Sequence, residues 1–318
     1  MPKPDLTKPE VVLSASTIKQ LEDCSYLHYV KKVLKFPDPG NAGSSRGSCS
    51  HLVFEVLQNP RHKKHYHTLL RTEKLSSVPS IDRLVIKHLK IYGIYESEHY
   101  DLVEKMIIVG LKHDFHGGKA KVQGIEKQFK VVSQNPKYSI GGFIDLLIED
   151  EKTDKVIVRD FKSQKSKFKD DELSGNIQAF TYTLAVKKQL IPTAKEVLVE
   201  FILLRFPEDP IQQVKIDDDQ LKGFEKYLAY MYKLVNNFTE DDARRNFAAD
   251  NPKKKWLCKA GATWECPARR PREFYVLLDG AKIIKSAFDK ESLDKVAKKG
   301  QIIEKRQYHG CPRHSCPK

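Results

Sequence analysis

Several features that define other classes of protein are missing from this chain of 318 residues. No apolar run reaches the roughly 18 residues that a membrane-spanning helix needs. The first residues, Met1-Pro2-Lys3-Pro4-Asp5, contain none of the hydrophobic core of a secretory signal. We therefore expect no membrane partner and no secretion, and we expect the protein to act in the cytoplasm of a cell.

The sequence also contains no Gly-x-x-x-x-Gly-Lys-Ser/Thr loop, no internal repeat and no low-complexity segment. Such a loop binds the phosphates of a nucleoside triphosphate, so its absence argues against a built-in ATPase or helicase motor. With 40% hydrophobic residues, a chain of this length can bury a sizeable core.

Positive charge exceeds negative charge, with 56 Lys and Arg against 42 Asp and Glu and a net charge of +14. This excess favours a polyanionic partner such as a nucleic acid, although a basic surface alone is common. Contacts with phosphates would supply much of the affinity and would weaken steeply with salt. The charge is concentrated in residues 119–137, 162–169, 252–255 and 269–272.

Two acidic residues and a lysine lie on two apolar segments that are typical of strands joined by a turn. Asp145 is in the first segment, and Asp160 and Lys162 end the second. Alternate side chains of a strand share a face, so Asp160 and Lys162 lie on one side, with Asp145 roughly opposite. Carboxylates bind Mg²⁺ directly, and the ion then activates water and polarises a phosphoryl oxygen. The pattern predicts metal-dependent cleavage of phosphodiesters.

The remaining pattern alternates between helical and extended segments. A helix at 17–34, opened by a capping box of Thr17 and Gln20, precedes a second helix that carries His51 and Glu55. Residues 62–118 are expected to be mostly helical. Strands are expected at 122–132, 138–149, 156–162 and 196–206, and helices at 175–190 and 221–238.

The order of these motifs resembles the PD-(D/E)XK nuclease superfamily, and in particular its RecB-like branch. The resemblance lies in Gly142-Phe143-Ile144-Asp145, then Asp160-Phe161-Lys162, then a helix with Gln178 and Tyr182. Upstream matches are residues 14–18 followed by Cys24, the histidine motif Arg46-Gly47-Ser48-Cys49-Ser50-His51 with Glu55, and Gly124-Ile125-Glu126. Each motif alone is common, and their arrival in this order within short loops carries the likeness.

This resemblance implies a role for each matched residue. His51, Asp145 and Asp160 would hold Mg²⁺ or Mn²⁺, with the backbone carbonyl of Phe161 as a further ligand. Lys162 would be the catalytic lysine, and Glu126 would support the metal ligands. Gln178, Tyr182 and Arg46 would contact DNA or brace the site. Asp160 stands where many relatives have Glu, which the family signature permits.

The resemblance also implies an α/β fold with a restriction-endonuclease-like core, in which helices flank a mixed central sheet. We expect a nuclease domain over residues 1–250, with a helical insertion at about 60–118. A basic, Cys-rich C-terminal region, residues 251–318, would pack on this core.

Six cysteines in an intracellular chain favour metal binding over disulfides. Some RecB-like nucleases, including CRISPR-associated ones, hold an iron–sulfur cluster with one cysteine from the first helix and three from the C-terminal region. Cys24 has the matching place, but seven residues separate Cys258 from Cys266, where a tight triplet is expected. A [4Fe–4S] set would combine these three with Cys311 or Cys316, whereas a zinc site would use the four C-terminal cysteines. Free thiols are a third reading.

These expectations define a metal-dependent deoxyribonuclease, an exonuclease or DNA-end-processing enzyme of recombination, repair or replication. Two alternatives stay open: a structure-specific or single-strand endonuclease, and a catalytically silent DNA-binding scaffold. Besides DNA, expected partners are a helicase, a recombinase or a single-strand-binding protein. A freestanding nuclease of this length fits a bacterial, viral or mobile-element source.

Overall fold

The computed structural model describes residues 11–38, 40–113, 120–150, 153–258 and 265–314. They form two units. The larger unit comprises residues 1–15 and 42–236, and the smaller unit comprises 16–41 and 237–318. This division differs from the predicted boundary at residue 250, because the segment 16–41 shares a hydrophobic core with C-terminal residues.

The larger unit is built on a mixed five-stranded sheet with the order β1-β2-β3-β4-β5. Only β3 and β4 run parallel, and the α7–α8 crossover joins them; the other neighbours are antiparallel. The strands are β1 Lys121–Gln134, β2 Lys137–Asp150, β3 Lys155–Lys162, β4 Glu196–Leu203 and β5 Ile211–Lys215. The predicted α/β core with a mixed sheet is confirmed, and four of its strands lie where the sequence predicts them. The short polar strand β5 was not predicted.

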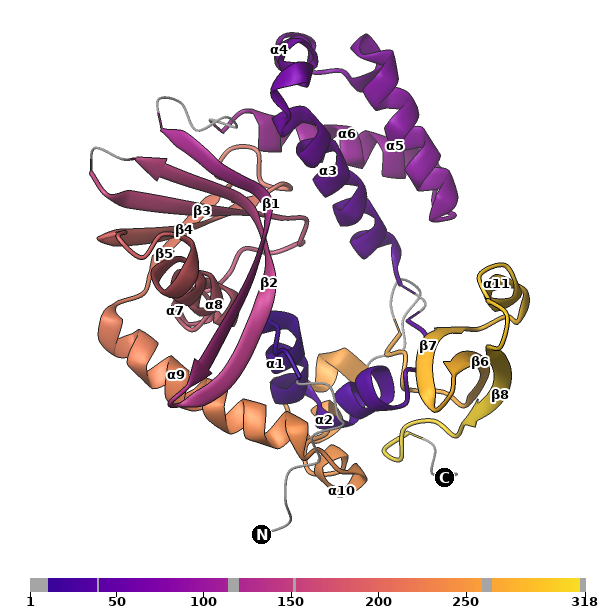
Figure 1. Ribbon diagram of the computed structural model, residues 1–318. Helices are drawn as coiled ribbons and strands as arrows, with labels where there is room; N and C mark the ends of the chain where they lie inside the picture. Colours follow the sequence, from indigo (N-terminus) through magenta and orange to yellow (C-terminus); the bar gives the residue numbers. More distant parts are fainter. Residues whose placement is uncertain (1–10, 39, 114–119, 151–152, 259–264, 315–318) are drawn as a thin grey trace. The chain divides into compact units, whose positions relative to one another are not determined.

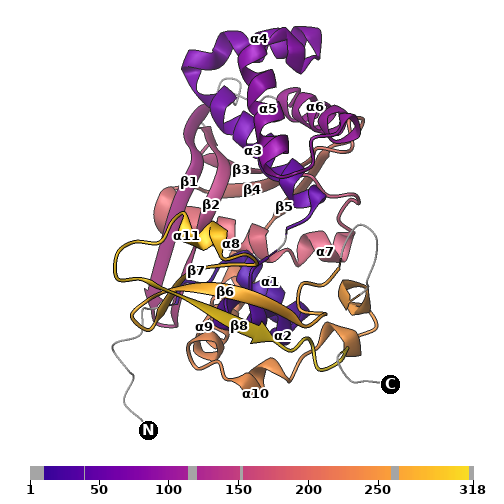
Figure 2. The ribbon, with the colours of Figure 1, turned by 90° about the vertical axis from the view of Figure 1, so that its right-hand side faces the viewer.

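Helices cover both sides of this sheet (Figures 1 and 2). On one side lie α3 Ala42–Gln58, η2 Pro60–His62, α4 Lys63–Thr72, η3 Leu75–Ser77, α5 Pro79–Ile91 and α6 Ser97–Leu111. On the other side lie α8 Ile177–Ala185, continued by η4 Val186–Leu190, and α9 Asp218–Asn236; the short helix α7 is Asp170–Ser174. The predicted helical stretch at 62–118 is therefore present over the residues that are described.

Close contact between α3 and α6 depends on a glycine. A Cβ atom at Gly110 would lie 2.3 Å from Cζ of Phe54 and 3.0 Å from Cδ2 of Leu204. The Phe54 ring in turn packs on Phe161 of β3, with ring centroids 4.4 Å apart. This close packing holds α3 against β3 near the end of the strand.

The free edge of β2 is partly covered by the N-terminal segment. Leu13 donates its N–H to Ser139 O at 2.8 Å, and Gly141 donates its N–H to Leu13 O at 2.9 Å. Leu13 thus forms a parallel bridge with Ile140. These bonds satisfy backbone groups where β3 no longer pairs with β2.

The smaller unit contains α1 Ala15–Asp23, α2 Ser25–His28, the π-helix η1 Tyr29–Val33, α10 Glu240–Ala243, η5 Ala248–Asp250, η6 Lys255–Cys258 and α11 Glu291–Asp294. Its three-stranded antiparallel sheet has the order β7-β6-β8, with β6 Arg272–Asp279, β7 Lys282–Ala287 and β8 Ile302–Tyr308 (Figure 2). The sequence did not predict this sheet. Its core is rich in aromatic rings, among them Phe36, Phe274 and Tyr308.

The predicted helix at 17–34 is interrupted, and the predicted capping box is wrong. Cys24 is extended, with φ −166° and ψ 105°, and separates α1 from α2. Thr17 lies inside α1, which begins at Ala15, so it cannot cap the first turn. Ser25 instead bonds to a distant segment, donating to Ala243 O at 3.0 Å.

Candidate metal centre and catalytic residues

Three elements of the larger unit bring a histidine and two carboxylates together. His51 comes from α3, Glu126 from β1 and Asp145 from β2. One ligand atom from each lies within 4.8 Å of the other two. A histidine nitrogen with carboxylate oxygens suits a divalent cation such as Mn²⁺, and the oxygens alone suit Mg²⁺.

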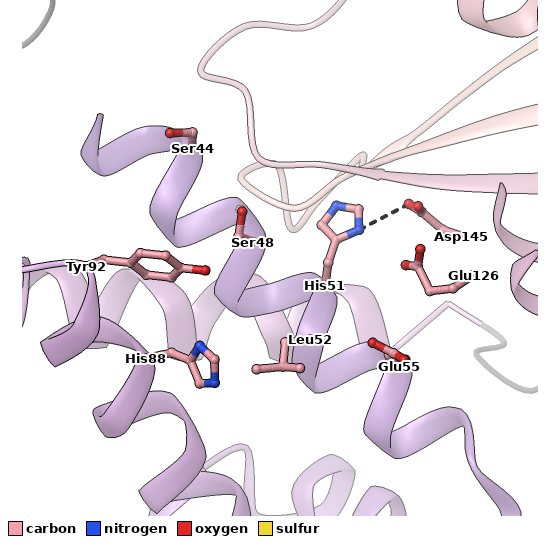
Figure 3. A pocket seen from close by; sticks show the side chains of 10 residues that line it. Ser44, Ser48, His51, Leu52, Glu55, His88, Tyr92, Glu126 and Asp145 are labelled. Atoms are coloured by element: carbon pink, nitrogen blue, oxygen red, sulfur yellow. Dashed lines mark ion pairs between the residues drawn. The ribbon is translucent and has the colours of Figure 1, made fainter. Parts of the chain in front are cut away.

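His51 is held by both neighbouring strands. Its Nδ1 lies 3.4 Å from Oδ2 of Asp145, an ion pair drawn in Figure 3, and its Nε2 lies 2.9 Å from the carbonyl oxygen of Phe161. Burial lowers the pKa of His51, but the hydrogen bond and charge of Asp145 outweigh it and raise the pKa to about 9. The surroundings of His51 thus carry negative charge, and a bound cation would displace the proton from the His51 ring.

Asp160 of β3 is almost fully buried, at 2% exposure. Its Oδ1 accepts hydrogen bonds from Gln178 Nε2 at 2.7 Å and from the Tyr182 hydroxyl at 2.8 Å. Its Oδ2 lies 2.6 Å from Lys162 Nζ but accepts no hydrogen bond of regular geometry from the described residues. Asp160 is not in the group of described residues that His51, Glu126 and Asp145 form, so its role as a metal ligand stays a prediction.

The electrostatics of Asp160 reflect this burial. Burial raises its pKa, the charge of Lys162 opposes that effect, and the nearby Asp145 carboxylate adds to it. Burial, followed by the Asp160 charge, also raises the pKa of Tyr182 well above its ordinary value, so its hydroxyl stays protonated as a donor. Two carboxylates held this close repel each other, and a cation between them relieves that repulsion.

Lys162 and Gln178 lie next to the Asp160 carboxylate and contact each other. Lys162 Nζ donates to Gln178 Oε1 at 2.6 Å and thus stays beside Asp160. The register explains why these strand ends meet: Leu146 pairs with Arg159, so Asp145 and Asp160 are the next residues in line. The predicted hairpin therefore brings both carboxylates and the lysine to one end of the strand pair.

Glu126 has an unusual backbone conformation. Its φ of 45° lies in the left-handed region, which is uncommon for a residue other than glycine. Pairing of Ile125 with Leu146 and of Lys127 with Ile144 continues on either side of it. Burial and the Asp145 carboxylate both raise the pKa of Glu126. Such local strain is typical of functional positions, and here it places Glu126 beside Asp145.

A cavity of about 550 Å³ opens next to this group of side chains. Its lining includes His51, Glu126 and Asp145, together with Glu55 one helical turn after His51 (Figure 3). Two further lining residues, His88 of α5 and Tyr92 directly after this helix, were not singled out from the sequence. Their spacing of four residues places them on one helix face, but only the tertiary fold turns that face toward α3.

Arg46 is not among the residues that line this cavity. Its side chain is buried at 9% exposure, and Nη1 lies 2.9 Å from Nδ1 of His99 on α6. This contact favours bracing of α3 against α6 over contact with DNA. Within the predicted basic stretches, Lys167 pairs with Asp209, and Glu265 pairs with Arg270 and Arg272, so the protein neutralises part of that charge itself.

Four of the predicted cysteines belong to one region of the smaller unit. Cys24 and Cys311 are buried in its core, and Cys258 and Cys266 pack against that core. Burial, and then the neighbouring thiols of Cys258, Cys24 and Cys311, raise the pKa of Cys266 to about 12. Cys316 lies outside the described residues. Cys49 lies apart on α3, in the core of the larger unit.

Comparison with known proteins identifies the family of this chain. Residues 12–299 match the family model described as the PD-(D/E)XK nuclease superfamily, and the chain belongs to that superfamily. None of the curated proteins compared with the sequence matches it. Among solved structures, a "Putative exonuclease" from Eubacterium rectale is similar at 10% identity and a TM-score of 0.44, covering 71% of this chain and 81% of that one.

The protein is therefore a nuclease by family, a hydrolase that acts on nucleic acid. Nucleases of this superfamily use divalent metals, and the group of His51, Glu126 and Asp145 is a candidate site for one. No helix within the described part of the chain is long and apolar enough to cross a membrane.

Proposed function

We propose that the protein is a Mg²⁺- or Mn²⁺-dependent deoxyribonuclease that degrades or trims DNA ends during recombination, repair or replication inside a cell. The observation that carries this proposal is the grouping of His51, Glu126 and Asp145 beside the buried pair of Asp160 and Lys162. Family membership supports the reaction class, and the net charge of +14 supports a polyanionic substrate.

In this proposal His51, Asp145 and Asp160 hold the metal, with the Phe161 carbonyl as a further ligand and Glu126 as a support or an additional ligand. The bound ion would supply a Lewis acid for the scissile phosphate and lower the pKa of the attacking water. Lys162 carries a positive charge toward the position of the attacked phosphate, where negative charge develops in the transition state. Gln178 fixes Lys162 and Asp160 relative to each other through one hydrogen bond to each.

The test is digestion of end-labelled single-stranded, linear double-stranded and closed circular DNA with Mg²⁺, Mn²⁺ or EDTA. We expect metal-dependent loss of linear DNA from its ends, which Asp160→Ala and Lys162→Ala each abolish while DNA binding persists. Lys155→Ala is the matched control, because Lys155 lies at the other end of β3 and pairs with Glu196. The control should cut like the wild type.

Other outcomes of the same experiment separate the alternatives. Cutting of the closed circle would make the protein an endonuclease. Binding without cleavage by the wild type would make it a silent scaffold. A helicase, a recombinase or a single-strand-binding protein remains the kind of partner that DNA-end processing requires.

We also propose that Cys24, Cys258, Cys266 and Cys311 hold a [4Fe–4S] cluster that stabilises the smaller unit. Their association with one core supports this set, and Cys₄ ligation suits such a cluster. Iron and sulfide analysis of anaerobically purified protein should show the cluster, and Cys24→Ser should lose it. Cys49→Ser, a buried cysteine of the other unit, should keep it. Stoichiometric zinc in place of iron would overturn the assignment.

A further inference from the structure

The cavity that contains His51 and Asp145 has a second wall, which α5 supplies. His88 and Tyr92 both line this cavity, and their ring centroids lie 6.1 Å apart. In Figure 3 the Tyr92 ring points toward Ser48 of α3, and His51 lies beyond Ser48. Neither His88 nor Tyr92 belongs to the candidate metal group of His51, Glu126 and Asp145, so the two rings are open to another part of a ligand.

The position of Tyr92 is fixed by how α5 packs and ends. Val85 and Leu89 are fully buried in the core that α5 shares with α3, so the neighbouring His88 and Tyr92 flank α3. Gly93, with φ 66°, then ends the helix: its N–H donates to Lys90 O at 3.0 Å, and Ile94 N–H donates to Leu89 O at 3.0 Å. Tyr92 nevertheless remains 40% exposed, which leaves its ring available to a ligand.

The floor of the cavity is one stripe of α3. Ser44, Ser48, His51 and Glu55 line it with the spacing of successive turns. At 1.5 Å per residue, Ser48 lies roughly 4–5 Å along the helix axis from His51. A strand with one phosphate at the metal centre would therefore place a neighbouring nucleotide over Ser48 and beside Tyr92.

The two ends of the cavity differ in charge. Glu55, Glu126 and Asp145 make the metal end acidic, so a second phosphate would be repelled there. The α5 end offers an aromatic ring and an imidazole, with the hydroxyl of Ser48 on the opposite side. Every nucleobase has a π-face that stacks on such rings regardless of sequence. The chemistry of the α5 end therefore matches a base, and a base enters such a cavity only when unpaired.

We propose that Tyr92, backed by His88, is a stacking subsite for the unpaired base next to the scissile phosphate. The inference rests on the proposed nuclease function and specifies its substrate as a single strand, either free or frayed from a duplex end. Ser48 donates its hydroxyl to the sugar–phosphate backbone of the same nucleotide.

The test compares hydrolysis of a thymidine oligonucleotide with hydrolysis of the same strand built from abasic residues. On the thymidine strand, Tyr92→Leu should raise KM about 5- to 140-fold, the range expected from the loss of one base–aromatic stack. Tyr92→Phe keeps the ring and should stay near the wild type. On the abasic strand all three proteins should have the same KM.

Tyr95→Leu is the matched control, because Tyr95 follows the same helix, is 46% exposed and contacts Lys90 outside this cavity. It should leave both substrates unaffected, and thermal unfolding should show that every variant is folded. An equal rise in KM for Tyr92→Leu on the thymidine and abasic strands would overturn the subsite. The same rise on a duplex whose cross-linked ends cannot fray would also overturn it. A wild type that cleaves neither strand would instead contradict the proposed nuclease function.

Discussion

Two buried ion pairs begin at adjacent residues of β3 and differ in how fully their polar atoms are satisfied. Arg159 donates from Nε to Glu200 Oε2 at 2.7 Å and from Nη1 to His113 O at 3.0 Å, and Gln213 Nε2 donates to Glu200 Oε1 at 2.7 Å. Asp160 has the Lys162 ammonium near Oδ2, but no regular hydrogen bond from the described residues reaches that oxygen.

Successive side chains of β3 point to opposite faces of the sheet, which explains how the adjacent residues Arg159 and Asp160 can have different roles. Arg159 and Asp160 point to opposite faces of the sheet, so each pair meets a different set of helices. Hydrogen bonds to the Arg159–Glu200 pair offset part of the cost of removing its charges from water. In the Asp160–Lys162 ion pair, Oδ2 of Asp160 can still accept a ligand, at a cost in stability. Such a cost is expected of an active site.

The largest expected effect is on activity. Asp160→Asn keeps the size of the side chain and its contacts with Gln178 and Tyr182, but removes a charge that a cation needs. We expect kcat on DNA to fall at least about 10³-fold, while the free energy of unfolding changes by less than about 1 kcal/mol. Quenched digestion assays and urea titration measure the two quantities. Retention of a tenth of the activity would contradict the comparison.

The complementary change is Glu200→Gln, which leaves the Arg159 guanidinium buried without its counter-charge. We expect a loss of about 3–5 kcal/mol in the free energy of unfolding and near-normal activity of the protein that remains folded. Glu196→Gln is the control on the same strand, because Glu196 pairs with the exposed Lys215 and its loss should cost far less stability than the loss of Glu200. Equal losses for both variants would show that burial does not set the difference.

His28 is a buried titratable group that forms no ion pair with any described residue, and it extends the comparison to the smaller unit. Burial, followed by the charges of Lys32 and Lys35, lowers the pKa of His28 to about 4. The unfolded chain, with a histidine pKa near 6.5, binds this proton first, so stability is complete above about pH 6.5 and falls as the pH approaches 4. We expect a loss of about 2 kcal/mol between pH 7.5 and pH 5. In urea titrations at both pH values, His28→Leu should not show this pH-dependent loss of unfolding free energy. His67 is exposed, so His67→Leu should still show it.

The smallest effect concerns the end of α5. Gly93→Ala meets no atom within 4 Å, so only its positive φ opposes the change. We expect a loss of about 1 kcal/mol in the free energy of unfolding. Gly223→Ala, inside α9 and equally open, should instead stabilise by a similar amount, because alanine favours a helix. Thermal unfolding measures both variants, and a shift of the melting temperature in the same direction for Gly93→Ala and Gly223→Ala would contradict this account.

Much of the fold was predictable because local pattern and tertiary structure agree there. Apolar, β-branched and aromatic runs separated by a polar stretch predicted β2 and β3, and the positions of Asp145, Asp160 and Lys162 on them predicted that these side chains meet at one end of a hairpin. The RecB-like resemblance added His51 from α3, which the hairpin alone does not indicate.

Other features depend on contacts that no local pattern contains. The break at Cys24 follows from Ser25 bonding to a segment more than 200 residues away, as its contact with Ala243 shows. The strands β7 and β8 of the smaller unit consist almost entirely of exposed or half-buried residues, so their apolar pattern is weak. Glu126 adopts a left-handed backbone that its residue type does not favour, and Tyr92 reaches the cavity only because α5 packs on α3.

The smaller unit is assembled from segments 16–41 and 237–318, which are interrupted in the sequence by most of the larger unit. During synthesis, apolar residues such as Val30 and Phe36 therefore cannot pack into this core until Phe274 and Tyr308 have been synthesised. Folding of the intervening residues restricts the separation between positions 41 and 237, so closing the gap costs less entropy than in an open chain. The order in which the chain leaves the ribosome thus favours the larger unit folding first and templating the joining of the two halves.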